Sequence, residues 1–169
     1  MPYLASRSVV VRVLLALVFF SLALSACGWR LQGTERLSQT LSVIYVDADD
    51  RYTDFNRALR DRLRASGAKV TERRADATAV VRIIKDQSGQ RVLSVSARNT
   101  PEEYEVFYTV EYSVASGSTE LIEAQPLEVT RDYSYDTTAV LAKQREQAIL
   151  RQALAQDLAS LVLRRLASL

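Results

Sequence analysis

The stretch Glu103–Val114, which reads EYEVFYTVEYSV, decides the fold of this 169-residue chain. Tyrosine and valine occupy every second position, and glutamate, phenylalanine, threonine and serine occupy the positions between them. Strict alternation over this length predicts a long β-strand with one buried face and one solvent-facing face. The buried face is expected to consist of Tyr104, Val106, Tyr108, Val110, Tyr112 and Val114.

The same alternation returns at residues 127–135, after a turn that Gly117 marks within residues 115–119. Two long strands joined by a short turn predict an antiparallel pair. Earlier in the chain, runs rich in β-branched residues predict strands at 41–46 and 78–85. The long strand therefore has neighbours on both sides in the sequence.

The region between the predicted strands is divided by turn-forming residues at 88–91 and 98–101. Residues 92–97 are expected to continue the strand before them or to pair with it. Residues 69–76 are rich in charge and are expected to hold a short strand at most.

Two helices are predicted, over residues 53–66 and 139–167. Thr53 suits the N-cap of the first helix and Gly67 its C′ position. Its apolar residues recur every four positions: Phe55, Leu59 and Leu63. The second segment is rich in strong helix formers, with N-cap candidates Asp136, Thr137 and Thr138 and an apolar stripe of Leu150, Leu154, Leu158, Leu161, Val162 and Leu166. This order predicts an α+β fold, a two-layer α/β sandwich in which a mostly antiparallel four-stranded sheet carries two helices on one face.

The composition excludes several classes of function. Beyond residue 26 the chain has 20 basic and 20 acidic side chains, since two of its 22 cations are Arg7 and Arg12, and so no basic excess favours nucleic acid. The chain has no histidine and one cysteine, which removes the usual general base and cysteine-rich metal sites. We therefore expect no enzyme, no metal and no cofactor. Four strand glutamates could be read as paired catalytic carboxylates, but solvated strand residues explain them equally well: Glu103, Glu105, Glu111 and Glu128.

The N-terminal segment has the pattern of a secretory signal. Arg7 and Arg12 precede an apolar run at 13–24 that is too short to span a bilayer. The tetrad that follows it, Leu24-Ser25-Ala26-Cys27, resembles the bacterial lipobox. We expect residues 1–26 to be a lipoprotein signal peptide, residues 27–40 a lipidated N-terminus and linker, and residues 41–169 a single domain. By resemblance to the known sorting rule for lipoproteins, glycine at position 28 favours the outer membrane. The alternatives are an ordinary signal peptide with a free cysteine, or an N-terminal membrane helix.

Two cations at loop positions are candidate binding residues. Arg98 precedes a turn that contains proline, and Lys143 lies in the first turns of the last helix. Arginine offers a phosphate a bidentate fork and lysine a point charge, although solvated surface cations are the alternative. Tyr104, Tyr108 and Tyr112 could form a stacking platform, but their alternation with valine favours the core.

Several short motifs, in order, resemble the LPS-assembly lipoprotein LptE family. They are Cys27-Gly28-Trp29-Arg30-Leu31, Arg98-Asn99, Glu103-Tyr104, Val129 with Arg131, and Leu141-Ala142-Lys143 with Glu146-Gln147. The resemblance extends from residue 1 to about residue 167, and a C-terminal tail that some members carry is missing.

The resemblance implies a lipid-anchored outer-membrane protein on the periplasmic side. It implies N-acyl and diacylglycerol groups on Cys27, a plug role inside the β-barrel LptD, and a part in lipopolysaccharide transport. It further implies that Arg98 and Lys143 contact lipopolysaccharide. The alternative function is a stand-alone periplasmic lipoprotein that binds a soluble ligand or cell-wall glycan.

Overall fold

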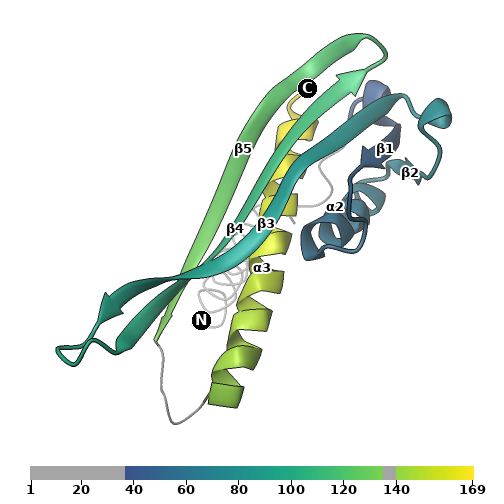
Figure 1. Ribbon diagram of the computed structural model, residues 1–169. Helices are drawn as coiled ribbons and strands as arrows, with labels where there is room; N and C mark the ends of the chain where they lie inside the picture. Colours follow the sequence, from purple (N-terminus) through teal and green to yellow (C-terminus); the bar gives the residue numbers. More distant parts are fainter. Residues whose placement is uncertain (1–36, 135–139) are drawn as a thin grey trace, which may run out of the picture. The chain divides into compact units, whose positions relative to one another are not determined.

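A computed structural model describes residues 37–134 and 140–169, which belong to one compact unit, residues 34–169 (Figure 1). Cys27, Tyr135 and the three N-cap candidates before the last helix lie outside the described residues. The elements in order are η1 (Gln39–Leu41), β1 (Val43–Asp47), α2 (Asp54–Ala65), β2 (Lys69–Thr71), η2 (Arg74–Asp76), β3 (Ala79–Val95), β4 (Pro101–Ser116), β5 (Thr119–Ser134) and α3 (Val140–Ala167). No helix within the described ranges is long and apolar enough to cross a bilayer.

The sheet contains five strands in the order β2-β1-β3-β4-β5. The predicted number of four is wrong, because Lys69–Thr71 forms a short edge strand parallel to β1. Three residues are too few to show an alternation, and this strand has a single neighbour. β1 also lies parallel to β3, whereas β3, β4 and β5 form the long antiparallel part that the sequence predicts.

The predicted turn at residues 88–91 is also wrong, since β3 runs without interruption from Ala79 to Val95. Gly89 pairs with Phe107 on β4, and a Cβ at this position would lie 2.6 Å from Cζ of the phenylalanine ring. The ring therefore covers the glycine on the open face of the sheet. This contact between strands keeps a turn-forming sequence extended. The reversal occurs later, at Ser96–Thr100, where Asn99 has φ 58°.

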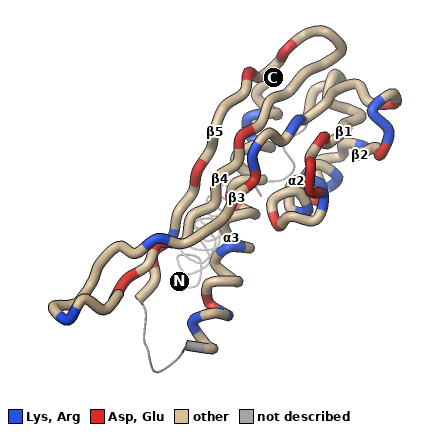
Figure 2. Tube along the Cα trace, viewed as in Figure 1, with Lys and Arg blue, Asp and Glu red and all other residues tan. Residues whose placement is uncertain are grey.

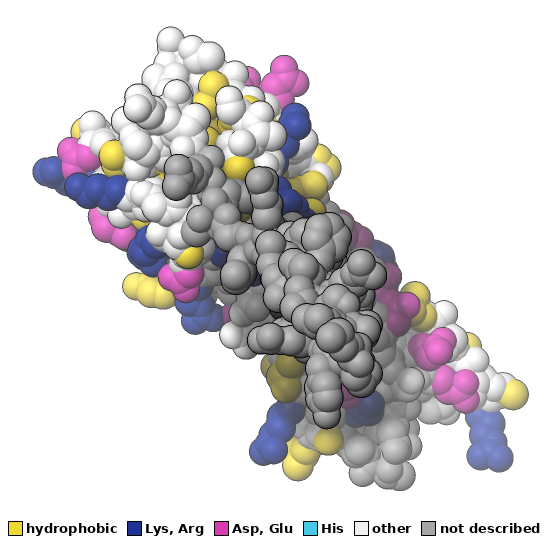
Figure 3. All heavy atoms as spheres, turned by 180° about the vertical axis from the view of Figure 1, so that it is seen from behind, with side chains coloured by type: hydrophobic (Ala, Val, Ile, Leu, Met, Phe, Trp, Pro, Cys, Tyr) yellow, Lys and Arg dark blue, Asp and Glu magenta, His cyan; other side chains and the backbone are white. Residues whose placement is uncertain are grey.

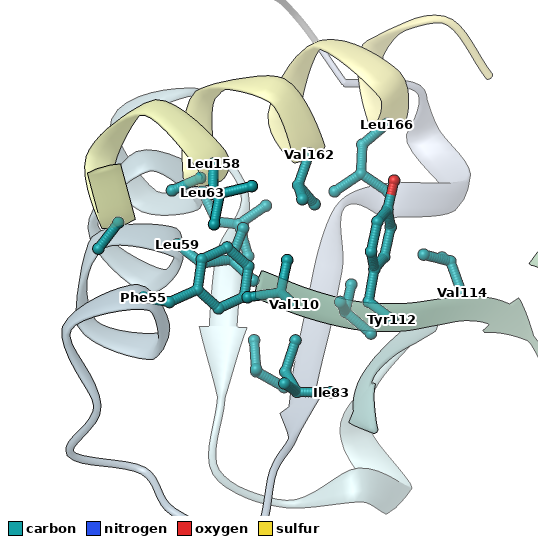
Figure 4. Packing of buried hydrophobic residues seen from close by; sticks show 14 of the residues in the cluster. Phe55, Leu59, Leu63, Ile83, Val110, Tyr112, Val114, Leu158, Val162 and Leu166 are labelled. Atoms are coloured by element: carbon teal, nitrogen blue, oxygen red, sulfur yellow. The ribbon is translucent and has the colours of Figure 1, made fainter. Parts of the chain in front are cut away.

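Both helices cover the same face of the sheet, and the predicted α+β sandwich is confirmed. The helices run in the same direction, because each returns the chain to the end of the sheet where β1, β2 and β5 begin. Asp54 at the start of α2 accepts a hydrogen bond from Arg151 of α3. Apolar side chains of both helices meet the valines and tyrosines of β4, as Figure 4 shows from close by. Those of α3 and β4 with less than 2% exposure are Leu154, Ala155, Leu158, Ala159, Val162, Leu166, Val106, Val110, Tyr112 and Val114.

A β-bulge between Ile83 and Lys85 reverses the faces of β3 and brings Asp86 opposite Val110, on the helix side. There the Asp86 carboxylate accepts hydrogen bonds from Thr53 Oγ1 at 2.6 Å and from the Tyr108 hydroxyl at 2.8 Å. Thr53 is the N-cap of α2, as predicted. The bulge thus ties the start of α2 to the middle of the sheet.

Candidate functional site

One part of the domain carries no buried residue. It comprises residues 90–105 of the β3–β4 hairpin and residues 141–150 of α3, and we call it the distal part. Its apolar side chains are exposed to solvent in the described structure: Val92, Leu93, Val95, Leu141 and Ile149. Exposed apolar groups next to charged ones are typical of interaction sites.

Lys143, a predicted binding residue, lies at the base of this part. Its ammonium Nζ is 2.8 Å from Glu146 Oε2 and 5.8 Å from the centre of the Tyr133 ring. The Tyr133 ring stacks on Tyr104 with centroids 5.8 Å apart, and its hydroxyl donates to Gln90 Oε1 at 3.0 Å. The lysine is therefore held in place by a carboxylate and an aromatic pair.

Arg98, the other predicted binding residue, lies in the turn at the tip of the hairpin. Figure 2 shows a blue segment at this tip. Its side chain is exposed, and it makes no ion pair with a described residue. Pro101 starts β4 three residues before Tyr104, which corresponds to about 10 Å of strand. Both cations therefore belong to the same end of the sheet, but no contact joins them.

The tyrosines lie mostly in the core, as predicted. Tyr108 and Tyr112 are 3% and 0% exposed, and Tyr104 is half-buried against Tyr133. Burial raises the pKa of the Tyr112 hydroxyl, and burial with the Asp86 hydrogen bond raises the pKa of Tyr108. These rings do not form an open stacking platform.

The strand glutamates are used in cross-strand pairs on the open face of the sheet. Glu105 and Glu128 both bind the Arg91 guanidinium, which also lies 5.4 Å from the centre of the Phe107 ring. Thr109 donates to Glu128 at 2.7 Å, and this bond, followed by Arg91, lowers the pKa of Glu128. The Ser94 hydroxyl donates to Glu103. Two of the four carboxylates are therefore held by one arginine, and no described group of histidine, cysteine and acidic residues is arranged to hold a metal.

Charges are intermixed over much of the surface. Seen from behind, dark blue and magenta side chains lie next to each other on the visible upper left part of the domain (Figure 3). Arg60 is the buried exception: it donates to Asn56 Oδ1 at 2.8 Å and to Glu72 Oε1 at 3.0 Å. Burial lowers its pKa from the usual arginine range. This network is internal and ties α2 to the segment after β2.

Sequence reasoning missed Asp86 and the Arg91–Phe107 contact. Simple alternation from Ile83 would place Asp86 on the open face of the sheet. Only the bulge at Ile84 turns its side chain to the helix side. Phe107 is the one aromatic residue on the polar face of β4, and this exception was a signal that an unusual partner lies opposite it. The partner is Gly89.

Comparison with known proteins gives consistent results. Residues 41–166 match the family model described as LptE, lipopolysaccharide-assembly. The LPS-assembly lipoprotein LptE of Pectobacterium atrosepticum is 28% identical over 148 residues, covering 84% of this chain and 77% of the relative. That of Yersinia enterocolitica is 26% identical over 158 residues, covering 92% and 75%.

Solved structures agree with these relatives. Rare lipoprotein B from Shewanella oneidensis is 31% identical, with a TM-score of 0.66 over 75% of this chain and 94% of that one. A lipoprotein B from Nitrosomonas europaea, at 24% identity and a TM-score of 0.69, shares the fold over 83% of this chain and 91% of its own. With the family model covering most of the domain, this chain belongs to the LptE family of lipopolysaccharide-assembly lipoproteins.

Proposed function

We propose that this protein is anchored to the outer membrane through a lipid on Cys27 and plugs an LptD-type β-barrel. In this role it takes part in inserting lipopolysaccharide into the outer leaflet. Family membership supports the assembly role. The anchor, the barrel and the contact with lipopolysaccharide are the proposal.

The distal part carries the proposal. It leaves five apolar side chains in solvent and places Arg98 at its tip. A domain that uses all its apolar surface for its own core would not need this extension. The open face of the sheet carries polar and charged side chains instead, and such a face suits the polar interior of a membrane barrel.

Lipopolysaccharide offers phosphate groups next to acyl chains, and the distal part offers cations next to apolar side chains. Arg98 is unpaired among described residues and can take a phosphate directly. Lys143 must exchange its contact with Glu146 for the phosphate. We therefore expect Arg98 to contribute more to binding than Lys143. Cations at these phosphates would weaken the bridges that divalent ions form between neighbouring molecules.

The test is lipopolysaccharide binding by the purified lipoprotein with Arg98→Ala and Lys143→Ala. We expect the double variant to bind at least tenfold more weakly while its thermal unfolding is unchanged, because neither side chain is buried in the core. Arg62→Ala with Lys85→Ala is the control, since it removes two cations outside the distal part that are exposed and form no ion pair with a described residue. Equal binding by the double variant and the control would remove both residues from the proposed site.

Affinity purification from outer membranes tests the barrel. The proposal requires a stable complex with a much larger barrel protein. A chain recovered alone, in an amount equal to its expression, would favour the stand-alone lipoprotein that binds a soluble ligand or cell-wall glycan.

A further inference from the structure

The cations without an ion pair are unevenly distributed over the domain. Charged side chains in the described residues balance, at 18 cations and 18 acids. Seven of these cations form no ion pair with a described residue: Arg62, Lys69, Lys85, Arg98, Arg145, Arg164 and Arg165. Four of the seven belong to one end of the domain, whereas six of the unpaired acids lie on β4 and β5. We call Arg62, Lys69, Arg164 and Arg165 the basic end.

The fold brings these four residues to the same end. Arg62 lies in the last turn of α2, and Arg164 and Arg165 lie in the last turn of α3. α2 joins the parallel strands β1 and β2 and so ends where β2 begins, and α3 runs back from the end of β5 toward this same end of the sheet. Lys69 begins β2, opposite Val43 at the start of β1. All four side chains are exposed.

The chain enters the domain at this same end. Leu37 packs against the core, η1 follows it, and β1 starts beside Lys69, whose backbone N–H donates to Ser42 O at 2.9 Å. Leu37 follows Cys27 by ten positions. Even fully extended, this segment spans no more than about 35 Å. A lipid on Cys27 would therefore keep the basic end close to the membrane surface.

We propose that the basic end docks on anionic phospholipid headgroups of the leaflet that holds the lipid anchor. The inference rests on the anchor of the proposed function and adds the orientation of the domain. A lipid and a basic patch together bind a membrane more firmly than either signal alone. Lysine and arginine near an anionic surface each contribute about 1 kcal/mol. The dipoles of α2 and α3 alone would explain cations in their last turns. In that case the orientation of the domain at a membrane would not depend on the charge of the phospholipids.

The domain's charge distribution favours this orientation over the reverse one. The acids without a described ion pair on β4 and β5 are Glu102, Glu103, Glu111, Glu120, Glu123 and Asp132. Glu102, Glu103 and Asp132 lie at the far end of these strands, near the hairpin tip, and an anionic surface would repel that end of the domain. Glu120 and Glu123, near the β4–β5 turn, lie at the same end of the sheet as Lys69 and offset part of its positive charge. Leu169, which is 47% exposed beside the last turn of α3, adds an apolar contact there.

The experiment uses the lipidated protein in vesicles, with a fluorophore on Ser168→Cys at the basic end or on Thr100→Cys at the hairpin tip. The vesicles contain phosphatidylcholine alone or with one third phosphatidylglycerol, and both contain a lipid with a quencher on its headgroup. We expect stronger quenching at Ser168→Cys in the anionic vesicles and no such difference at Thr100→Cys. Raising the salt from about 0.1 M to about 1 M, which shortens the Debye length from ~10 Å to ~3 Å, should abolish the difference.

Charge removal sharpens the result. Arg164→Gln with Arg165→Gln should lower the ratio of docked to undocked protein about 30-fold, because two contributions of ~1 kcal/mol are lost. Arg164→Lys with Arg165→Lys should keep it, and Lys85→Gln with Arg145→Gln is the control with equal charge loss. If the glutamine variant fails to fold, the salt dependence of the unchanged sequence decides.

Two failures are distinguishable by the mass of the protein. A mass without lipid contradicts the lipid anchor of the proposed function, and it contradicts the docking proposal as well because that proposal requires the anchor. A lipidated protein whose Ser168→Cys label is quenched equally in both vesicles overturns the docking and leaves the anchor intact.

Discussion

The near part of the domain and its distal part use apolar residues in opposite ways. In the near part, where α2 and the second half of α3 cover the sheet, large apolar side chains such as Leu59, Leu158 and Tyr112 are completely buried. In the distal part, no residue from 90 to 105 or from 141 to 150 is buried. The difference indicates that the near part is stabilised by its own core, whereas the distal part is shaped for something that the chain does not supply.

The largest expected effect separates the two parts of α3. Leu158→Ala removes a fully buried side chain and should lower the free energy of unfolding by about 2–5 kcal/mol. Ile149→Ala makes a comparable deletion on the same helix, but 67% of its side chain is already exposed. We expect it to change stability by less than about 0.5 kcal/mol. Urea unfolding of both variants, followed by circular dichroism, measures the contrast.

Equal destabilisation by these two substitutions would contradict the division. It would mean that the first half of α3 is packed in the free protein. An unchanged slope of the unfolding free energy with urea would show that neither substitution alters the denatured state.

The contrast also explains what the sequence could predict. Alternation in β4 and β5, the cap at Thr53 and the apolar stripes of both helices were sufficient for the near part, because core packing imposes a period on the residues that make it. The structure confirms these elements to within one or two residues for α2. Burial on one face is what makes a fold readable from a single sequence.

The features that the sequence did not reveal depend on a partner strand. The turn expected at residues 88–91 is extended because Phe107 covers Gly89, and β2 exists because β1 lies beside it. The bulge at Ile84 follows the same rule, since a bulge is defined by two strands together. For the site, Arg98 and Lys143 came from a resemblance, and no pattern in their own neighbourhood distinguishes them from other surface cations.

A smaller effect is expected at the boundary between the parts, where Asp86 joins α2 to the sheet. Burial raises the pKa of this carboxyl, and the hydrogen bonds from Thr53 and Tyr108 oppose the shift without cancelling it. Above its unfolded-state pKa of about 3.8, the folded protein therefore holds the Asp86 proton to higher pH than the unfolded chain does. This residue's contribution to the free energy of unfolding falls as the pH rises from 3.8 through the folded-state pKa.

Asp86→Asn removes this titration, so the stability of the unchanged protein relative to the variant should fall as the pH rises through that window. Unfolding by urea at a series of pH values between about 4 and 7 measures the difference between the two proteins. Carboxyls with a lowered pKa, such as Glu128, make stability rise with pH. They do so in both proteins, and their contribution cancels when the two unfolding free energies are subtracted. A stability of the unchanged protein that rises with pH relative to the asparagine variant would show that the Asp86 carboxyl is stabilised in its charged form, contrary to its burial.

The smallest effect on the stability of the free protein is expected from substitutions in the distal part. Val92→Ser, Val95→Ser and Leu141→Ser each replace a side chain that is about half or more exposed. Surface substitutions of this kind usually change stability by less than about 0.5 kcal/mol. The free lipoprotein should therefore unfold at an unchanged temperature with all three replaced.

The same three substitutions should reduce recovery of the barrel in affinity purification, because the lost apolar surface is what a partner would bury. Tyr52→Ser is the control, because this residue is 83% exposed and lies just before α2, outside the distal part. A variant that unfolds at a lower temperature would place these side chains in the domain's own core. A variant that keeps both its stability and its partner would leave the exposed apolar surface of the hairpin without a role in assembly, and Arg98 and Lys143 would then have to account for the distal part by themselves.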